Sequence, residues 1–434
     1  MKTEYLRRIA GPCGHRQMRT AVPSKYTILT QNISSCAKVI DTVALKEFFD
    51  SIPKQIVPFT DCEIRQNGKT IFRYGQGFSD YEHSRPVSAT DLYWMYSCSK
   101  VVTAVAAMRL IEQERLGLYD LVETYIPEFS DVTVLQRKDT RVYDPLKAEF
   151  VGTASSAAVH TAPAKNKMRI YDLLRMASGL SYDLTVPQVQ CFKTDPSLGT
   201  QDFARLQAQV PLKFEPGTDF LYSFSHDVLA AVIEIVTGMA FDAYLQKEIF
   251  DPLGMEHTGF SPKEDDTYRL AAQYMMDSDG VTFHDIGKGN EFVFNPSIKS
   301  GGGGLASTLD DMMRFCDVLA NGGTTADGYC LLTKSAIDLM RQSHLNDVQK
   351  KSLHRSWPHL LNYSYGLGVR TFEENRDGNG GEPGEFGWEG AAGSLLLIDP
   401  NNRISCVYTQ HVRKCSLATN YIHRHIIRAI YTAE

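Results

Sequence analysis

The sequence lacks the patterns that mark common metal, redox and nucleic-acid sites. Its nine cysteines stand singly, with no CxxC pair and no zinc-type spacing of Cys and His, so we expect reduced thiols and no metal. No run of Lys or Arg could follow a phosphate backbone, and the formal net charge of -6 comes from acids and bases mixed along the chain. We therefore expect no nucleic-acid partner.

Long apolar stretches are also missing. No window approaches the length that spans a bilayer, and residues 1–20 contain basic side chains without the apolar segment of a secretory signal. We expect a cytoplasmic protein with no membrane partner. A P-loop, a dinucleotide fingerprint and a G-x-S-x-G elbow are each incomplete or absent, which predicts no cofactor. The sequence leaves the oligomeric state open.

Regular secondary structure is predicted at both ends of the chain. Asp41 is a plausible N-cap for a helix over 42–52, and residues 62–75 are typical of a β-hairpin with Asn67–Gly68 at its turn. A second hairpin is predicted over 394–410. A helix follows it, with an apolar face formed by Ile422, Ile426 and Ile430.

If the two terminal hairpins share one antiparallel sheet, the fold is α+β, with terminal helices flanking the sheet and a mostly helical domain inserted. We predict a loosely ordered leader over 1–40, a discontinuous sheet domain over 41–99 and 361–434, and a helical domain over 100–360. The active site is expected in the cleft between the domains. Four consecutive glycines, 301–304, favour tight backbone near that cleft rather than an anion cradle.

The S-x-x-K pattern, a nucleophile with its base, occurs three times: at Ser35–Lys38, Ser51–Lys54 and Ser97–Lys100. Only the third precedes a long apolar segment, "VVTAVAAMRLI", which is typical of a buried helix. Three residues apart on that helix, Lys100 lies on the same face as Ser97. Burial would lower the lysine pKa and let a neutral amine accept the serine proton. The alternative is that Ser97 or Ser99 only caps the helix.

Several segments, in order, resemble one known family. They are "NGKTIFRYGQGFSD", "YSCSK", "LVETYIPEF", "MRIYDLLRMASGLSYD", "FEPGTDFLYSFSHDVLAAVIEIVTG", "FDPLGMEHTGF", "GGGGLAST" and "FGWEGAAGSLLLIDP". Together they resemble the serine β-lactamase-related family, and within it the branch of class C β-lactamases and family VIII carboxylesterases. The resemblance covers roughly residues 42–434 and implies a β-lactamase/transpeptidase-like fold.

The resemblance implies that Ser97 is acylated and that Lys100 is its proton acceptor. The family's second motif, a tyrosine followed two residues later by asparagine, falls on Tyr222–Ser223–Phe224. Tyr222 matches, which implies that it shares the base role with Lys100. Phe224 replaces the asparagine that contacts the acylamide side chain of β-lactam or peptide substrates. Tyr182, in "SGLSYD", is a nearby competitor that does not fall on the motif.

The third motif falls on Trp388–Glu389–Gly390. Gly390 matches, which implies close approach of the strand edge to substrate and an oxyanion hole made by the backbone N–H groups of Ser97 and Ala391. Trp388 replaces a cationic or polar residue, so it can pack against an acyl or alcohol group but cannot bind a β-lactam carboxylate by a charge-assisted bond. Phe224 and Trp388 are therefore expected to line an apolar substrate pocket.

The predicted function is that of a serine hydrolase acting through an acyl-enzyme on small carboxylic esters, with a small-molecule ester or amide as substrate. β-Lactamase or D-amino-acid peptidase activity and acyl transfer to an alcohol are alternatives. A binding protein that retains the fold without turnover is a further one. Whether Lys100 or Tyr222 is the base stays open at this point.

Overall fold

The computed structural model describes residues 40–136, 142–144, 149–151, 160–262, 264–378 and 380–432. The predicted leader therefore lies outside the described residues except for Ile40. So does the first S-x-x-K match, Ser35–Lys38.

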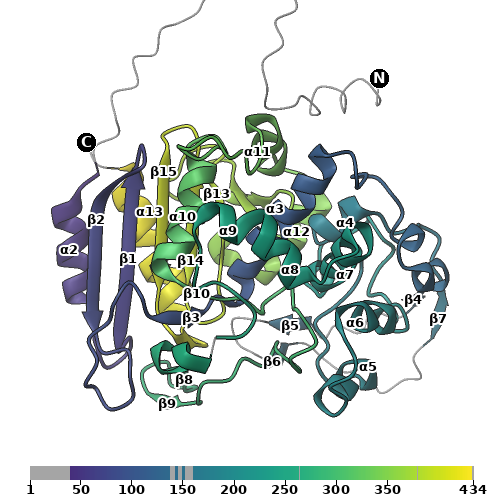
Figure 1. The fold of residues 1–434 in the computed structure, drawn as a ribbon, viewed down its shortest axis with the longest axis horizontal. Coiled ribbons are helices and arrows are strands. Elements are labelled where there is room, and N and C mark those ends of the chain that lie inside the picture. Colours follow the sequence, from purple (N-terminus) through teal and green to yellow (C-terminus); the bar gives the residue numbers. More distant parts are fainter. Residues whose placement is uncertain are drawn as a thin grey trace, which may run out of the picture.

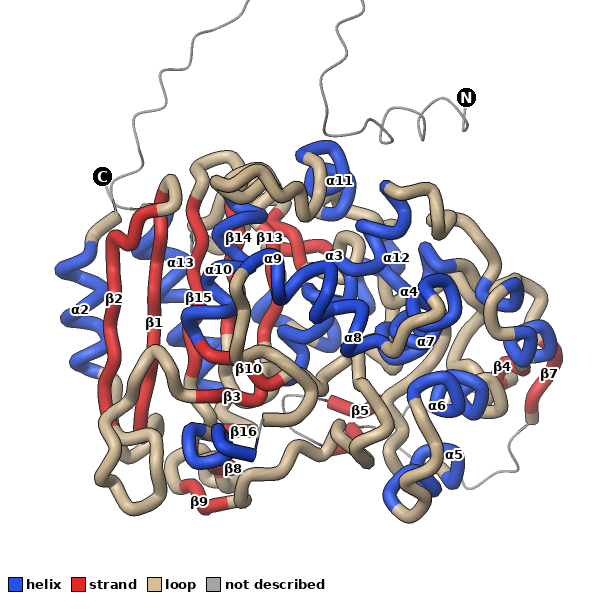
Figure 2. Tube along the Cα trace, viewed as in Figure 1, coloured by secondary structure: helices blue, strands red, loops and turns tan. Residues whose placement is uncertain are grey.

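The fold is built on a seven-stranded antiparallel sheet that joins both ends of the chain (Figures 1 and 2). Its order is β11-β12-β13-β14-β15-β1-β2, and the pairing of β1 with β15 runs from Asp61 opposite Thr409 to Gln66 opposite Ile404. The strands are β1 (Phe59–Gln66), β2 (Lys69–Gly77), β11 (Tyr363–Tyr365), β12 (Arg370–Phe372), β13 (Phe386–Glu389), β14 (Leu395–Asp399) and β15 (Ile404–Thr409). The predicted α+β fold is confirmed.

Local signals at both ends of the chain form the predicted elements. The Asp41 carboxylate accepts hydrogen bonds from the backbone N–H groups of Val43 and Ala44 and so caps α2 (Thr42–Ser51). Asn67 and Gly68 both have positive φ, 52° and 75°, as a type I′ turn requires. The second hairpin joins β14 to β15, and the three isoleucines of the last helix, 422, 426 and 430, are buried.

Helices cover both faces of the sheet (Figure 1). On one face, Phe49 of α2 stacks on Tyr408 of β15, whose ring also meets His423 at the start of α13 (His423–Tyr431). On the other, α10 (Leu309–Ala320) packs on β15, where the Ser405 hydroxyl donates to the Asp317 carboxylate over 3.1 Å. Helix α10 belongs to the 100–360 stretch, so part of that stretch covers the sheet. The predicted domain boundaries stay a prediction.

The helical part of the molecule lies beside the sheet (Figure 1). Its central contact joins α3 (Ser99–Glu112) to α7 (Ser225–Thr237), and both helices are buried over most of their length. Other helices here include α4 (Ile170–Leu174), α5 (Pro187–Gln190), α6 (Thr200–Gln207), α8 (Phe241–Leu245), α9 (Asp251–Leu253), α11 (Lys334–Met340) and α12 (Asp347–Ser356). Two short strands, β3 (Leu92–Trp94) and β10 (Ala306–Thr308), pair with each other; β10 leads directly into α10, and β3 leads into α3 through a short turn.

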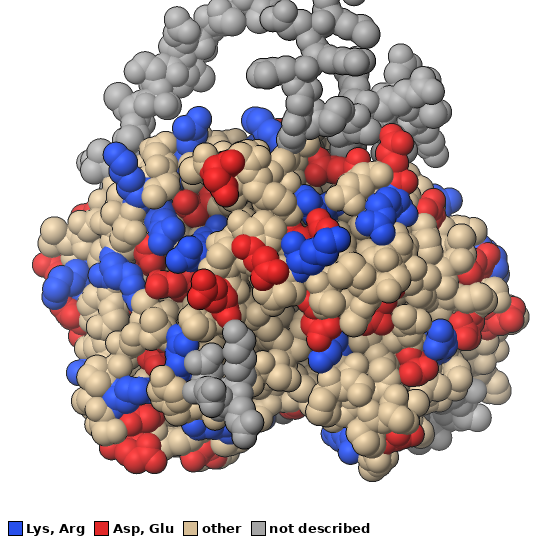
Figure 3. Space-filling view, viewed as in Figure 1, with Lys and Arg blue, Asp and Glu red and all other residues tan. Residues whose placement is uncertain are grey.

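No single helix of the described residues is both long and apolar enough to cross a membrane. One pair bent by 76°, Ser225–Thr237 with Phe241–Leu253, meets that test by length and composition when taken together. On the face shown in Figure 3, Lys and Arg side chains are interspersed with Asp and Glu.

Candidate active site

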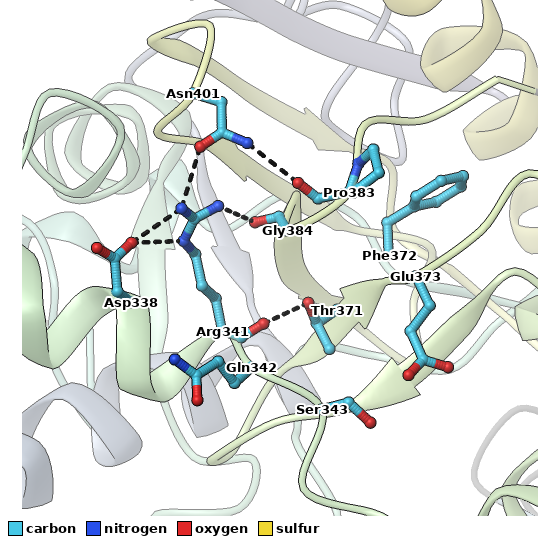
Figure 4. A pocket seen from close by; sticks show the side chains of 10 residues that line it. All are labelled: Asp338, Arg341, Gln342, Ser343, Thr371, Phe372, Glu373, Pro383, Gly384 and Asn401. Carbon is cyan, nitrogen blue, oxygen red and sulfur yellow. Dashed lines mark hydrogen bonds and ion pairs between the residues drawn. The ribbon is translucent and has the colours of Figure 1, made fainter. Parts of the chain in front are cut away.

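A surface pocket lies beside β12, and none of the predicted site residues lines it (Figure 4). Its guanidinium, from Arg341 after α11, is fully engaged. It donates to the Asp338 carboxylate over 2.9 Å, to the Gly384 carbonyl oxygen over 3.0 Å and to the Asn401 amide oxygen over 3.0 Å. These bonds tie α11 to the turn before β13 and to the β14–β15 hairpin, which is a structural role.

Ser97 lies at the point where β3 passes into α3. Tyr96 has a positive φ of 45°, uncommon outside glycine and asparagine, and a 3₁₀ turn over Tyr96–Cys98 leads into the helix. Ser97 therefore precedes the α-helix rather than forming its first turn. From Asp91 to Met108 every residue except Ser97 is buried. The sharp turn thus presents one hydroxyl at the surface of an otherwise buried segment.

Lys100, the residue that the sequence analysis expected to act as the base, is buried. Its side chain has no exposed surface, and its amine donates to the Gly302 carbonyl oxygen over 2.5 Å and lies 3.4 Å from the Ser97 hydroxyl. Burial disfavours the ammonium form and lowers the Lys100 pKa to about 7, although the charge of Asp227 acts in the opposite direction. A substantial fraction of neutral amine is therefore present at neutral pH.

The two candidate tyrosines contact Lys100 in different ways. The Lys100 amine donates a 2.7 Å hydrogen bond to the Tyr182 hydroxyl, whereas it lies over the ring of Tyr222, 4.3 Å from the centroid. Tyr182, which did not fall on the motif, is thus the tyrosine that bonds directly to the amine. Burial raises the pKa of Tyr222 well above its usual range, and hydrogen bonds with Ser97 and Trp388 only partly offset this. Tyr222 is consequently a neutral phenol near pH 7.

Aromatic rings hold Tyr222 in place. The Trp388 indole N–H donates to the Tyr222 hydroxyl oxygen over 2.8 Å, and the two rings stack with centroids 5.4 Å apart. Trp357 packs edge-on against Tyr222, and Tyr365 packs edge-on against Trp388. Trp388 therefore positions the phenol oxygen of Tyr222 and also forms an apolar wall. The sequence analysis predicted only the packing.

The glycines 301–304 bring backbone close to the base, as predicted. A Cβ on Gly302 would lie 2.4 Å from a carboxylate oxygen of Asp227 and 2.8 Å from the Tyr182 hydroxyl. Asp227, buried at the start of α7, accepts from the Ser300 hydroxyl over 2.6 Å and from the Gly302 N–H over 3.2 Å. The carboxylate thus holds Gly302, the residue whose carbonyl oxygen accepts from Lys100.

Gly390 and Ala391 follow β13 and border Ser97. A Cβ on Gly390 would lie 2.7 Å from the Met95 carbonyl oxygen, so glycine lets the strand end approach the segment before the nucleophile. Gly390 thus approaches Met95 closely, whereas the sequence analysis predicted a close approach of this strand edge to substrate. The Ala391 N–H makes no hydrogen bond within the described residues, and Ala391 lines the same cleft as Ser97. This free donor has the position expected of one half of an oxyanion hole.

Phe224 does not line the cleft, in contrast to its predicted contact with substrate. Its side chain is buried, and its ring packs edge-on against Tyr182 with centroids 4.4 Å apart and against Phe203 at 5.1 Å. As the residue preceding α7, it points into the core behind Tyr182. Its effect on substrate would pass through Tyr182.

A small cleft lies beside Ser97. It is lined by Ser97, Tyr222, Trp357, His359, Leu360, Trp388, Glu389 and Ala391. Sequence reasoning did not find Trp357, His359 or Leu360, which come from the segment after α12 and meet the cleft only through the fold. Across the described ranges, no group of three or more His, Cys, Asp or Glu side chains is arranged to hold a metal ion.

Comparison with known proteins assigns the family. The profile named Beta-lactamase matches residues 63–414. The chain belongs to the Beta-lactamase family. Proteins of similar sequence include the lovastatin esterase of Penicillium rubens, which is 27% identical over 338 residues that cover 74% of this chain and 79% of that protein. Esterase EstB of Burkholderia gladioli is 28% identical over 326 residues, which cover 70% of this chain and 75% of that protein.

Solved structures show the same fold for this Beta-lactamase family member. The unliganded simvastatin synthase LovD of Aspergillus terreus has a TM-score of 0.71 at 21% identity, covering 91% of this chain and 99% of that one. EstCE1, described as a hydrolase with promiscuous acyltransferase activity, has a TM-score of 0.68 at 23% identity, covering 89% and 96%. Among the curated relatives are also proteins named putative D-alanyl-D-alanine carboxypeptidase. The sequence relatives named here are thus esterases and a putative carboxypeptidase, while the two solved structures share the fold.

Proposed function

We propose that the protein is a serine esterase that cleaves carboxylic esters through an acyl-enzyme on Ser97. The observation that supports this most directly is the pair at the base of the cleft. The partly exposed Ser97 hydroxyl lies 3.4 Å from the amine of Lys100, whose pKa burial lowers to about 7. A serine beside an amine that is partly neutral at pH 7 is an activated nucleophile.

In the proposed reaction the neutral Lys100 amine takes the Ser97 proton while the hydroxyl oxygen attacks the ester carbonyl carbon. The negative charge that develops on the carbonyl oxygen is bound by the backbone N–H groups of Ser97 and Ala391. The C–O bond to the alcohol then breaks, and the alcohol leaves with a proton. Water attacks the acyl group in the second half-reaction, which releases the acid and restores the Ser97 hydroxyl.

The two tyrosines have separate roles in this proposal. Tyr182 accepts from the Lys100 amine over 2.7 Å and so holds it beside Ser97. Because its pKa is raised by burial, Tyr222 acts as a neutral phenol that passes a proton between Lys100 and the leaving oxygen, and Lys100 is the base. Of the two candidates that the sequence left open, we therefore propose Lys100 as the base.

The acyl-enzyme can be tested by trapping. With diethyl p-nitrophenyl phosphate, the protein is expected to release one equivalent of p-nitrophenol and to carry one diethylphosphoryl group on the peptide that contains Ser97, as measured by mass spectrometry. Steady turnover of p-nitrophenyl butyrate but not of nitrocefin would favour an esterase over a β-lactamase. Ester turnover without any adduct on Ser97 would contradict the proposal.

Trp388→Phe is expected to lower kcat for p-nitrophenyl butyrate by about tenfold. The substitution keeps an aromatic wall but removes the hydrogen bond to the Tyr222 hydroxyl, and loss of a bond to a buried polar group costs about 1–3 kcal/mol. Steady-state kinetics at pH 8 would measure it. Trp357→Phe is the matched control, since it trims an indole from the same cleft without removing a hydrogen bond to Tyr222. Equal losses of kcat in both variants would show that packing alone matters.

A further inference from the structure

The cleft above Ser97 has one polar end in an otherwise aromatic and aliphatic wall. His359, in the 3₁₀ turn Pro358–Leu360, and Glu389, at the end of β13, both line it. The His359 Nε2 atom lies 2.9 Å from the Glu389 Oε2 atom, and the two side chains are 6% and 10% exposed. A nearly buried imidazole–carboxyl pair that lines the same cleft as Ser97 is a candidate for substrate recognition.

The hydrogen bonds around this pair fix where its protons lie. Burial opposes ionisation of Glu389, but the hydrogen bond with His359 and the electrostatic interactions with His359 and His423 outweigh it and hold the Glu389 pKa well below its usual range. An ionised carboxylate only accepts, so His359 Nε2 must carry a hydrogen. The His423 Nε2 atom faces the Gly393 carbonyl oxygen at 3.0 Å, and its Nδ1 atom, 3.6 Å from Glu389, makes no hydrogen bond.

His359 therefore has one ring nitrogen left for a ligand. Nε2 is taken by Glu389, and Nδ1 makes no hydrogen bond to the described residues. Nδ1 is not one of the fully buried polar atoms without a hydrogen-bond partner. Part of its surface is therefore accessible. His359 and Glu389 line a second small pocket as well, whose other walls include Asn362, Asp377 and Arg424. When protonated, Nδ1 is a donor, and His359 lines the same cleft as Ser97.

We propose that His359, held by Glu389, binds a carboxylate carried by the substrate, so that the enzyme prefers esters whose acyl chain ends in a negative charge. This inference rests on the proposed esterase function and specifies its substrate class. The aromatic wall of Trp357 and Trp388 packs on the methylene chain, while the imidazolium donates to the terminal carboxylate. Glu389 is a positioning residue, because it contacts His359 and makes no contact with the reacting atoms.

The test compares two ethyl esters of equal length, ethyl hydrogen adipate and its neutral amide analogue ethyl adipamate, by release of ethanol. The wild-type protein is expected to have the higher kcat/KM for the adipate. In His359→Gln the ratio of the two kcat/KM values should fall by about tenfold, because a hydrogen bond between charged groups contributes about 1.5–3 kcal/mol. Glu389→Gln should lower the ratio as well. His425→Gln, on α13, is the matched control and should leave the ratio unchanged.

The ratio separates recognition from a structural role, since distortion of the cleft would reduce turnover of both esters alike. An unchanged ratio in His359→Gln, or a wild-type enzyme indifferent to the carboxylate, would overturn the proposal. So would a preference for ethyl 6-hydroxyhexanoate over both esters, which would make Nδ1 an acceptor. If the wild type cleaves neither these esters nor p-nitrophenyl butyrate, the esterase proposal fails. Calorimetric binding of ethyl hydrogen adipate, about tenfold weaker in His359→Gln, would then still support the carboxylate site, and equal binding would refute it.

Discussion

Ser97→Ala is expected to lower kcat/KM for p-nitrophenyl butyrate by roughly 10⁴-fold or more, because no acyl-enzyme can form without the hydroxyl. The cleft, the free Ala391 amide and Lys100 stay in place, so a small residual rate above that of free solution should remain. The measurement is initial-rate release of p-nitrophenol by wild type and variant at equal concentration.

The chain provides a matched control for this variant. Ser51 and Lys54 have the same spacing as Ser97 and Lys100, but Ser51 is exposed at the end of α2 and its hydroxyl only donates to the Phe48 carbonyl oxygen. Ser51→Ala should therefore retain wild-type activity. Equal thermal unfolding of both variants would show that the loss lies in chemistry. Retention of full activity by Ser97→Ala would exclude Ser97 as the nucleophile.

The comparison of the three S-x-x-K matches shows which part of the site a sequence can predict. What distinguished Ser97 was the apolar segment that follows it, because such a segment forms a buried helix and desolvates the lysine one turn later. That information is local, as are the Asp41 cap and the Asn67–Gly68 turn. Elements set by neighbours in the chain were accordingly predicted well.

Residues brought to the site by tertiary contacts were predicted less well. Tyr182 reaches Lys100 from an irregular segment, where Gly179 has a positive φ of 86° and no periodicity indicates which way the side chain points. Phe224 followed the motif in sequence, yet the start of α7 turns its ring into the core behind Tyr182. A motif position therefore does not decide whether a side chain faces substrate.

The His359–Glu389 pair is the clearest example of this limit. The two residues are thirty positions apart and meet only because a 3₁₀ turn after α12 packs against the end of β13. One signal was available in the sequence, since an acid in the otherwise apolar strand "FGWEG" needs a partner when buried. Nothing local to either residue identifies that partner.

Lys100→Met is expected to lower kcat/KM for p-nitrophenyl butyrate by about 10³-fold, because general-base catalysis contributes about 10²–10⁴-fold. In the wild type, only the neutral amine accepts the Ser97 proton, so kcat/KM should rise with pH and level off above the Lys100 pKa of about 7. The Lys100→Met variant should lack this rise of kcat/KM with pH. Lys54→Met, in the exposed Ser51–Lys54 match, should keep the wild-type rate and pH dependence. If the rise persisted in Lys100→Met, the base would be another group.

The same substitution should change stability in the opposite direction. Burial holds the Lys100 pKa at about 7, below its ordinary value of 10.5, so between these pH values the unfolded chain binds a proton that the folded chain does not. Through this group the wild-type free energy of unfolding rises as pH increases from about 7 to 10.5. Lys100→Met lacks this rise of the free energy of unfolding with pH. The amount by which the variant is more stable than the wild type in urea unfolding should therefore be largest at pH 6 and smaller at pH 9. Identical pH dependence in both proteins would show that Lys100 is not the desolvated amine on which the proposed chemistry depends.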